Sequence, residues 1–314
     1  MIFPIPDDLK KLNETPLVLT AVALNILLFV LIFSSRPNNV HVDKLLSSEQ
    51  LDISGWNYFQ YLGSQSPEQL AQQPDWVQSI QIQKPSQRVL LGVYALRDAE
   101  FLNQVLQGRR FTGNSVEQER WQQTVVQYSE AQKKDPLHKY GLSSFNQSPL
   151  RWITYQFSHS DFFHLFSNLV FLMVLGFAVE RRMGSAVFIG VYLIGGLAGG
   201  ALFTATSPTS AVPMVGASAA VSALLAYYVM IESNRRIRFF YFLSPWPGHY
   251  GPIFLPTLLL IPLYLLTDVN SWLSTPEGFG TSVAYTAHMG GSLVGLVLGG
   301  MTRLSLFSSK LSPS

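Results

Sequence analysis

Residues 214–222 have the sequence Met-Val-Gly-Ala-Ser-Ala-Ala-Val-Ser and open an apolar segment that continues to residue 231. A glycine two residues before Ser218 favours a turn at the mouth of a helix, with the serine hydroxyl in the opening turn. Under a purely structural interpretation, the Ser218 hydroxyl donates a hydrogen bond to a carbonyl oxygen one turn earlier, as serines in apolar helices most often do. A catalytic interpretation rests on His288, which lies in another apolar segment near the C-terminus and would supply a general base.

The composition is that of a membrane protein, since 48% of the 314 residues are hydrophobic and only 13% are charged. A net charge of +2, with no basic stretch interleaved with aromatic residues, argues against a nucleic-acid partner. The chain contains no cysteine, which excludes thiol catalysis, thiolate metal sites and disulfides.

The hydrophobic segments predict an all-α polytopic membrane protein with six transmembrane helices. The first is not followed by a cleavage site and is predicted to remain in the protein. The segments are residues 16–34, 162–179, 186–204, 214–231, 252–267 and 282–301.

The polar region 35–149 predicts a soluble, mainly helical insert after the first helix. Ser66 and Asn114 stand at helix-start signals within it, whereas the first half of 88–106 is compatible with a strand or a helix. His41 and His138 are predicted to be solvated surface residues.

Lys and Arg cluster at alternate connections, which predicts cytoplasmic termini (residues 1–15 and 304–314) and an extracytoplasmic insert. The basic residues are Lys10, Lys11, Arg181, Arg182, Arg235, Arg236, Arg238, Arg303 and Lys310. The second, fourth and sixth helices then run inward, so their first turns share one membrane depth. His288 would lie roughly 10 Å below the outer end of its helix.

This layer contains the parts that serine hydrolysis needs: Ser218 as nucleophile, His288 as base, and His164 with Asn168 as oxyanion donors. His164 and Asn168 are four residues apart and share a helical face, and the Ser218 N–H is a further donor. Asp161 and Asp268 lie only near the ends of predicted helices, so we expect a dyad rather than a triad.

Small residues are predicted to bring the two catalytic helices together. Gly291, Gly295 and Gly299 repeat every four residues and would face Ala219, Ala220 and Ala223; Gly195, Gly196, Gly199 and Gly200 form a similar set. The fifth segment contains Pro252, Pro256 and Pro262, which predict a kinked helix that is either a movable element or simply irregular. The aromatic residues between 239 and 250 predict an interfacial belt.

At these motifs, residues 140–303 resemble the rhomboid intramembrane serine proteases. The resemblance implies a rhomboid catalytic core at 150–303, a Ser218/His288 dyad, oxyanion binding by His164 and Asn168, and no cofactor. His159, Gly216, Gly291 and Gly295 would support the site. The matching motifs are Leu150-Arg151, with only the arginine of a Trp-Arg pair; His159, His164 and Asn168; Glu180-Arg181-Arg182-Met183-Gly184; Gly216-Ala217-Ser218; and Ala287-His288 followed by Gly291 and Gly295.

Two residues depart from the family pattern. Ala219 replaces the glycine that usually follows the nucleophile, and Ser222 replaces an aromatic residue that often stacks on the catalytic histidine. These departures predict a weaker site and a less firmly held His288.

The resemblance implies single-pass transmembrane proteins as substrates and a multi-pass location in a bacterial inner membrane; it does not specify the oligomeric state. The main alternative is a non-catalytic rhomboid-like protein that binds transmembrane helices for quality control. A metalloprotease would need a His-Glu-X-X-His helix and an aspartyl protease two intramembrane carboxylates, neither of which is found in the predicted spans. A transporter would need charged or broken-helix ion sites.

Overall fold

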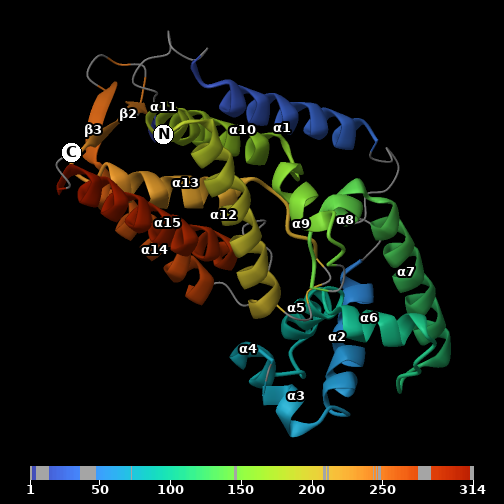
Figure 1. Cartoon of the computed structure of the whole chain (residues 1–314). Coiled ribbons are helices and arrows are strands. Elements are labelled where there is room, and N and C mark those ends of the chain that lie inside the picture. Colours follow the sequence, from blue (N-terminus) through green and yellow to red (C-terminus); the bar gives the residue numbers. More distant parts are fainter. Residues whose placement is uncertain are drawn as a thin grey trace.

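The computed structural model describes residues 2–4, 14–35, 47–71, 73–144, 147–207, 210, 212–242, 244, 246, 249–274 and 284–311. The described chain is mainly helical, with one small sheet (Figure 1). His41, Lys10, Lys11 and the start of the sixth predicted segment lie outside the described residues.

Four described helices are long and apolar enough to cross a membrane: Pro16–Ser34, Phe162–Met183, Ser185–Thr206 and Tyr285–Ser308. The first is α1 and has the predicted bounds; the third is α12. The second consists of α10 (Phe162–Phe171), a π-helical turn (Leu172–Gly176) and α11 (Phe177–Met183). The fourth belongs to α15 (Tyr285–Leu311).

Two predicted segments form shorter apolar helices with different bounds. α13 (Ser218–Ile231) begins at Ser218 itself, because residues 214–217 form the turn that precedes it. α14 (Thr257–Ser274) begins after Pro256 and continues past the predicted end at residue 267. Asp268 therefore lies inside this helix, whereas the sequence had placed it just after the helix end.

A three-stranded antiparallel sheet was not predicted from the sequence. Its order is β1 (Ile2–Pro4), β2 (Arg236–Phe242) and β3 (Tyr250–Pro256). The aromatic and β-branched residues of β2 favour a strand. Pro252 and Pro256, which predicted a kinked helix, lie instead in an edge strand, where a missing N–H is tolerated. An interfacial location for these aromatic residues stays a prediction.

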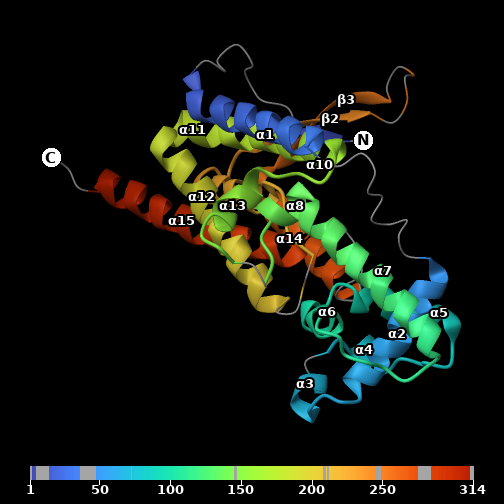
Figure 2. The same ribbon diagram turned by 90° about the vertical axis from the view of Figure 1, so that its right-hand side faces the viewer.

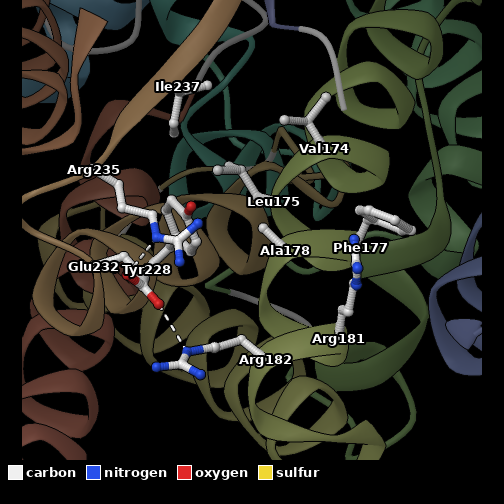
Figure 3. A pocket seen from close by; sticks show the side chains of 10 residues that line it. All are labelled: Val174, Leu175, Phe177, Ala178, Arg181, Arg182, Tyr228, Glu232, Arg235 and Ile237. Atoms are coloured by element: carbon white, nitrogen blue, oxygen red, sulfur yellow. Dashed lines mark hydrogen bonds and ion pairs between the residues drawn. The ribbon is translucent and has the colours of Figure 1, made fainter. Parts of the chain in front are cut away.

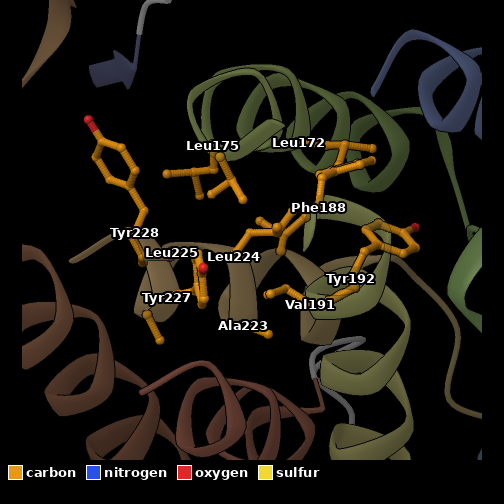
Figure 4. Close-up of a cluster of buried hydrophobic side chains, with 14 of the residues drawn as sticks. Leu172, Leu175, Phe188, Val191, Tyr192, Ala223, Leu224, Leu225, Tyr227 and Tyr228 are labelled. Carbon is orange, nitrogen blue, oxygen red and sulfur yellow. The ribbon is translucent and has the colours of Figure 1, made fainter. Parts of the chain in front are cut away.

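The core of the bundle surrounds α13, which packs most extensively against α15 and also against α12. Figure 4 shows Leu224 of α13 among side chains that include Leu172, Phe188 and Tyr192. A Cβ atom at Gly291 would lie 2.1 Å from the carbonyl oxygen of Ala219, and one at Gly295 would lie 2.2 Å from that of Ala223. The predicted close approach of these two helices is confirmed.

The first and second apolar helices are joined by Glu180, whose carboxylate is buried at the end of α11. It accepts hydrogen bonds from the backbone N–H groups of Leu17 (3.1 Å) and Val18 (2.8 Å), and from the Ser185 hydroxyl (2.5 Å). The first turn of α1 has N–H groups without intrahelical partners, so a carboxylate there satisfies both hydrogen bonding and the helix dipole.

The insert is helical and has its own hydrophobic cluster, which includes Tyr58, Phe101 and Trp121. Both predicted helix starts are confirmed, because Ser66 and Asn114 accept hydrogen bonds from the first turns that follow them. The ambiguous region 88–106 is helical. The helices are α2 (Ser48–Leu62), α3 (Pro67–Ala71), α4 (Asp75–Gln78), α5 (Pro85–Ala95), α6 (Ala99–Leu106), α7 (Ser115–Lys134) and α8 (Pro136–Tyr140).

The prediction for His138 was wrong. Both of its ring nitrogens are buried and have no hydrogen-bond partner among the described residues. Burial lowers the pKa of His138, so the ring favours its neutral form. The neighbouring Arg151 donates to the carbonyl oxygens of His138 (2.7 Å) and Gly141 (3.2 Å), which fixes the chain that leads into the bundle.

The insert lies beside the end of α12 (Figures 1 and 2). Asp98 of the insert forms an isolated β-bridge with Ser210, in the segment between α12 and α13. Leu142 forms a second bridge with Met214, four residues before Ser218. The insert thus contacts the segment between α12 and α13 at two points, and the second contact lies just before the Ser218 turn.

Candidate active site

Ser218 and His288 lie at the same end of two neighbouring helices. Ser218 is the first residue of α13, and His288 lies in the first turn of α15. Gly291, one turn after His288, packs on the backbone of Ala219. His288 is buried and Ser218 half-buried, and the Ser218 hydroxyl makes no hydrogen bond within the described part of the chain. The fold therefore brings the two residues to one end of the bundle, while the bond between them is not formed.

The predicted oxyanion residues lie against the turn before Ser218. A Cβ atom at Gly216 would lie 2.7 Å from His164 Nε2 and 3.8 Å from Asn168 Nδ2. Gly216 has a φ of +117° and donates its N–H to Tyr155 O at 2.9 Å, so both its conformation and the space around it require glycine. The structure thus brings together His164, Asn168 and the Gly216 turn, as predicted.

The orientation of His164 leaves one ring nitrogen for the site. Its Nδ1 lies 3.0 Å from the Ser160 hydroxyl, so Nε2 is the nitrogen beside Gly216. Asn168 Nδ2 donates one hydrogen to His164 O at 2.8 Å and keeps a second one. His164 Nε2 and Asn168 Nδ2 therefore both lie beside Gly216, and Nε2 is a donor in the tautomer in which the Ser160 hydroxyl donates to Nδ1.

His159 contacts both His164 and the backbone of the turn before Ser218. Its ring is buried, contacts the His164 ring edge to face at 5.2 Å, and Nε2 lies 3.5 Å from the backbone N–H of Ala217. Burial, reinforced by the nearby His164, lowers the pKa of His159 to about 3. The ring is therefore neutral at physiological pH, as an acceptor for the Ala217 N–H must be.

This low pKa predicts a specific loss of stability in acid. An unfolded histidine gains a proton near pH 6.5, whereas folded His159 does so only near pH 3, so stability falls with pH across that window. Between pH 7.5 and pH 5 we expect His159 to remove about 2 kcal/mol from the free energy of unfolding. Thermal unfolding of the detergent-solubilised protein at both pH values measures this loss.

The variant His159→Gln should lose less stability in acid than the parent does. The control is His249→Gln, which replaces an exposed histidine in the same way and is measured beside it. Equal pH dependence in the parent and His159→Gln would show that this residue is not the source.

Sequence reasoning missed Asp268 and Tyr264, both of which contact His288. The Asp268 carboxylate oxygens lie 3.2 and 3.3 Å from His288 Nδ1, and the Tyr264 ring stacks on the imidazole with centroids 5.8 Å apart. The expectation that no acidic residue could orient His288 was therefore wrong, because α14 extends far enough to include Asp268. The Ser218/His288 dyad itself stays a prediction. The signal was present in the sequence: Tyr264 and Asp268 are four residues apart and share a helical face.

The two departures from the family pattern have structural explanations. The Ala219 methyl group packs against Gly199, where a Cβ atom would lie only 2.5 Å from it. Ser222 is buried and bonded to Tyr264, so an aromatic contact with His288 is made from α14 instead of α13. His288 therefore has an aromatic neighbour, although the serine at position 222 had suggested that it would lack one.

Known proteins are similar to this chain in sequence. Residues 146–305 match the profile of the Rhomboid domain. The chain is 32% identical over 148 residues to the "Rhomboid protease GlpG" of Salmonella paratyphi A, covering 47% of this chain and 46% of that protein. It is also 29% identical over 163 residues to the "RHOMBOID-like protein 12, mitochondrial" of Arabidopsis thaliana, covering 46% of this chain and 44% of that protein.

The chain thus spans less than half the length of the curated relatives it matches. The apolar helices and the matched domain together make it a multi-pass membrane protein. Because the matched domain covers half of the chain and includes every residue placed around Ser218 and His288, the protein belongs to the rhomboid family.

Proposed function

We propose that this protein is an intramembrane serine endopeptidase that hydrolyses a peptide bond in or near the outer part of a substrate transmembrane helix. The observation that carries the proposal is the convergence on one turn: Ser218 and His288 begin adjacent helices, and His164 and Asn168 lie against Gly216. Such an arrangement serves acyl transfer, which needs a nucleophile, a base and oxyanion donors within reach of one carbonyl.

The contacts of His288 assign its two nitrogens different tasks in this mechanism. Because Nδ1 faces Asp268, Nε2 is the nitrogen that takes the Ser218 proton as Oγ attacks the peptide carbonyl. His164 Nε2–H and Asn168 Nδ2–H stabilise the resulting oxyanion. His288 then gives the proton to the leaving amine, and water hydrolyses the acyl-enzyme by the same steps.

The substrate would be a single-pass membrane protein, with small residues at the scissile bond to suit a site built from glycine and alanine. We further propose six membrane spans in a bacterial inner membrane, with both termini in the cytoplasm. This topology places Ser218 near the outer surface of the membrane and the insert on its extracytoplasmic side.

The alternative is a rhomboid-like protein that binds transmembrane helices without cleaving them. It is favoured by one observation, since the Ser218 hydroxyl is not bonded to His288 in the described structure. Catalytic hydrogen bonds often tighten only when substrate is bound, so an open Ser218 is also compatible with catalysis.

Cleavage in proteoliposomes distinguishes these two functions. The substrate is a tagged single-pass reporter with small residues near its outer membrane boundary. We expect the parent and the control Ser308→Ala, whose serine is exposed at the other end of α15, to cleave it, and Ser218→Ala not to. A parent that retains the reporter on affinity purification and never cleaves it would support the binding function. A reporter cleaved equally by Ser218→Ala would contradict the proposed nucleophile.

A further inference from the structure

We propose that Asp268 is the positioning residue of a Ser218–His288–Asp268 triad, and that α14 orients the base through both Asp268 and Tyr264. This inference rests on the proposed protease function and deepens it.

The environment of Asp268 indicates a role for its carboxylate. The residue is only 5% exposed, in an apolar helix, where an unpaired charge is costly. Within the described part of the chain its hydrogen-bond partner is His288, whose Nδ1 lies 3.2 Å from Oδ2. A carboxylate at Nδ1 holds the proton on that nitrogen, keeps Nε2 free to accept, and stabilises the imidazolium that forms during attack.

Tyr264 fixes the plane of the imidazole. Its ring stacks on His288 with an interplanar angle of 26°, and its hydroxyl lies 2.8 Å from the Ser222 hydroxyl. Ser222 in turn donates to the carbonyl oxygen of Ser218 at 2.7 Å. The nucleophile helix, the stacking ring and the base are therefore connected through two hydroxyl groups, and the small side chain of Ser222 leaves room for the ring.

This arrangement links the position of α14 to catalysis. The opposite face of α14 is exposed at Leu259, Leu263 and Leu266, as expected of a helix that borders lipid. A substrate that displaced α14 would separate Asp268 and Tyr264 from His288.

Variants of Asp268 in the full chain, reconstituted in liposomes, test the inference. Asp268→Asn should reduce kcat/KM by about 10²–10⁴, because the amide can donate to Nδ1 and so favours the tautomer with the proton on Nε2. In Asp268→Ala the acid limb of the pH–activity profile should move to lower pH, because the carboxylate that stabilises the imidazolium is gone. A merely structural role would lower the rate without moving this limb.

The control is Asn270→Ala, an exposed position on the same helix, which should behave as the parent does. Tyr264→Phe should retain more activity than Tyr264→Ala, since it keeps the stacked ring. Activity of Asp268→Asn within about twofold of the parent, with an unmoved acid limb in Asp268→Ala, would overturn the triad even though Ser218→Ala remains inactive.

A readout without cleavage separates this inference from the proposed function. In ¹⁵N-histidine-labelled protein, we expect the NMR signal of His288 to show a protonated Nδ1 in the parent and a mixture of tautomers in Asp268→Ala. An unchanged His288 signal would contradict the orienting role whether or not the protein cleaves the reporter.

A second inference concerns the end of the bundle opposite Ser218, where a cavity of about 390 Å³ lies between α11, α13 and β2. One wall is apolar and includes Val174 and Leu175 of the π-helical turn (Figure 3). The rest carries three arginines, Arg181, Arg182 and Arg235, around one carboxylate, Glu232.

The charges in this cavity are unbalanced. Glu232 binds Arg182 at 2.8 Å and Arg235 at 3.0 Å, but both arginine side chains stay more than 60% exposed. Arg181 has a looser pairing with Glu14, at 3.6 Å. Guanidinium groups at the end of membrane helices, beside an apolar wall, fit a phosphate with an attached acyl chain. We infer that the cavity binds the headgroup of an anionic phospholipid.

Native mass spectrometry of the detergent-solubilised chain with phosphatidylglycerol or phosphatidylcholine tests this site. We expect retention of phosphatidylglycerol over phosphatidylcholine, with at least a several-fold loss in the double variant Arg181→Ala, Arg182→Ala. The control Arg303→Ala removes a basic residue that lies outside the cavity and donates to Met230 O. Equal retention of both lipids, equal loss in the control, or equally tight binding of soluble glycerophosphate would contradict a lipid site.

Discussion

Replacing His288 by alanine is expected to lower kcat/KM for the single-pass reporter by about 10⁴ or more. Without the imidazole the proposed mechanism loses the base that takes the proton from Oγ and the acid that protonates the leaving amine. Ser218→Ala removes the nucleophile and should have an effect of the same order. Initial cleavage rates in proteoliposomes give both values.

The double variant Ser218→Ala, His288→Ala should be no slower than either single variant, because the two residues act as one unit. Additive losses would show that they act separately. Each variant must also unfold at a temperature close to that of the parent, so that a lost fold is not mistaken for lost chemistry.

Adding a methyl group at Gly291 is expected to destabilise the bundle and abolish most activity. The new Cβ would lie 2.1 Å from Ala219 O and 2.9 Å from its carbonyl carbon, and a backbone carbonyl cannot rotate away as a side chain can. The helices must separate, which also moves His288 away from Ser218. We expect Gly291→Ala to cost about 1–3 kcal/mol of unfolding free energy, measured by thermal unfolding in detergent.

Gly190 provides a matched control on α12, since nothing lies within 4 Å of the position of its Cβ atom. Gly190→Ala should be neutral or slightly stabilising, because alanine favours a helix more than glycine does. If both variants behaved alike, the close approach of α13 and α15 at Gly291 would not be what holds the site together.

The sequence predicted the apolar helices well, because length and hydrophobicity decide whether a segment suits a membrane. The bounds of α1 were correct, and the facing of Gly291 on Ala219 followed from the four-residue spacing of small residues. The predicted grouping of His164 and Asn168 with the Ser218 turn is also observed.

The fifth apolar segment was more difficult, for two physical reasons. Three prolines suggested one kinked helix, but two of them belong to the edge strand β3. The residues of its partner, β2, had been assigned to an aromatic belt at the membrane interface. The length of α14 was consequently underestimated, and Asp268 was placed beyond it. Pairing of strands and stacking of side chains from different helices depend on tertiary structure, which no local pattern in one chain encodes.

Covalent labelling of Ser218 tests the central claim most directly. The parent, His288→Ala and Ser218→Ala are treated with a fluorophosphonate, and the modified residue is identified by mass spectrometry. An activated serine nucleophile predicts one adduct on Ser218 in the parent, a rate at least about 10²-fold lower in His288→Ala, and none in Ser218→Ala. An unlabelled Ser218 in folded parent protein, or labelling that does not depend on His288, would contradict the account.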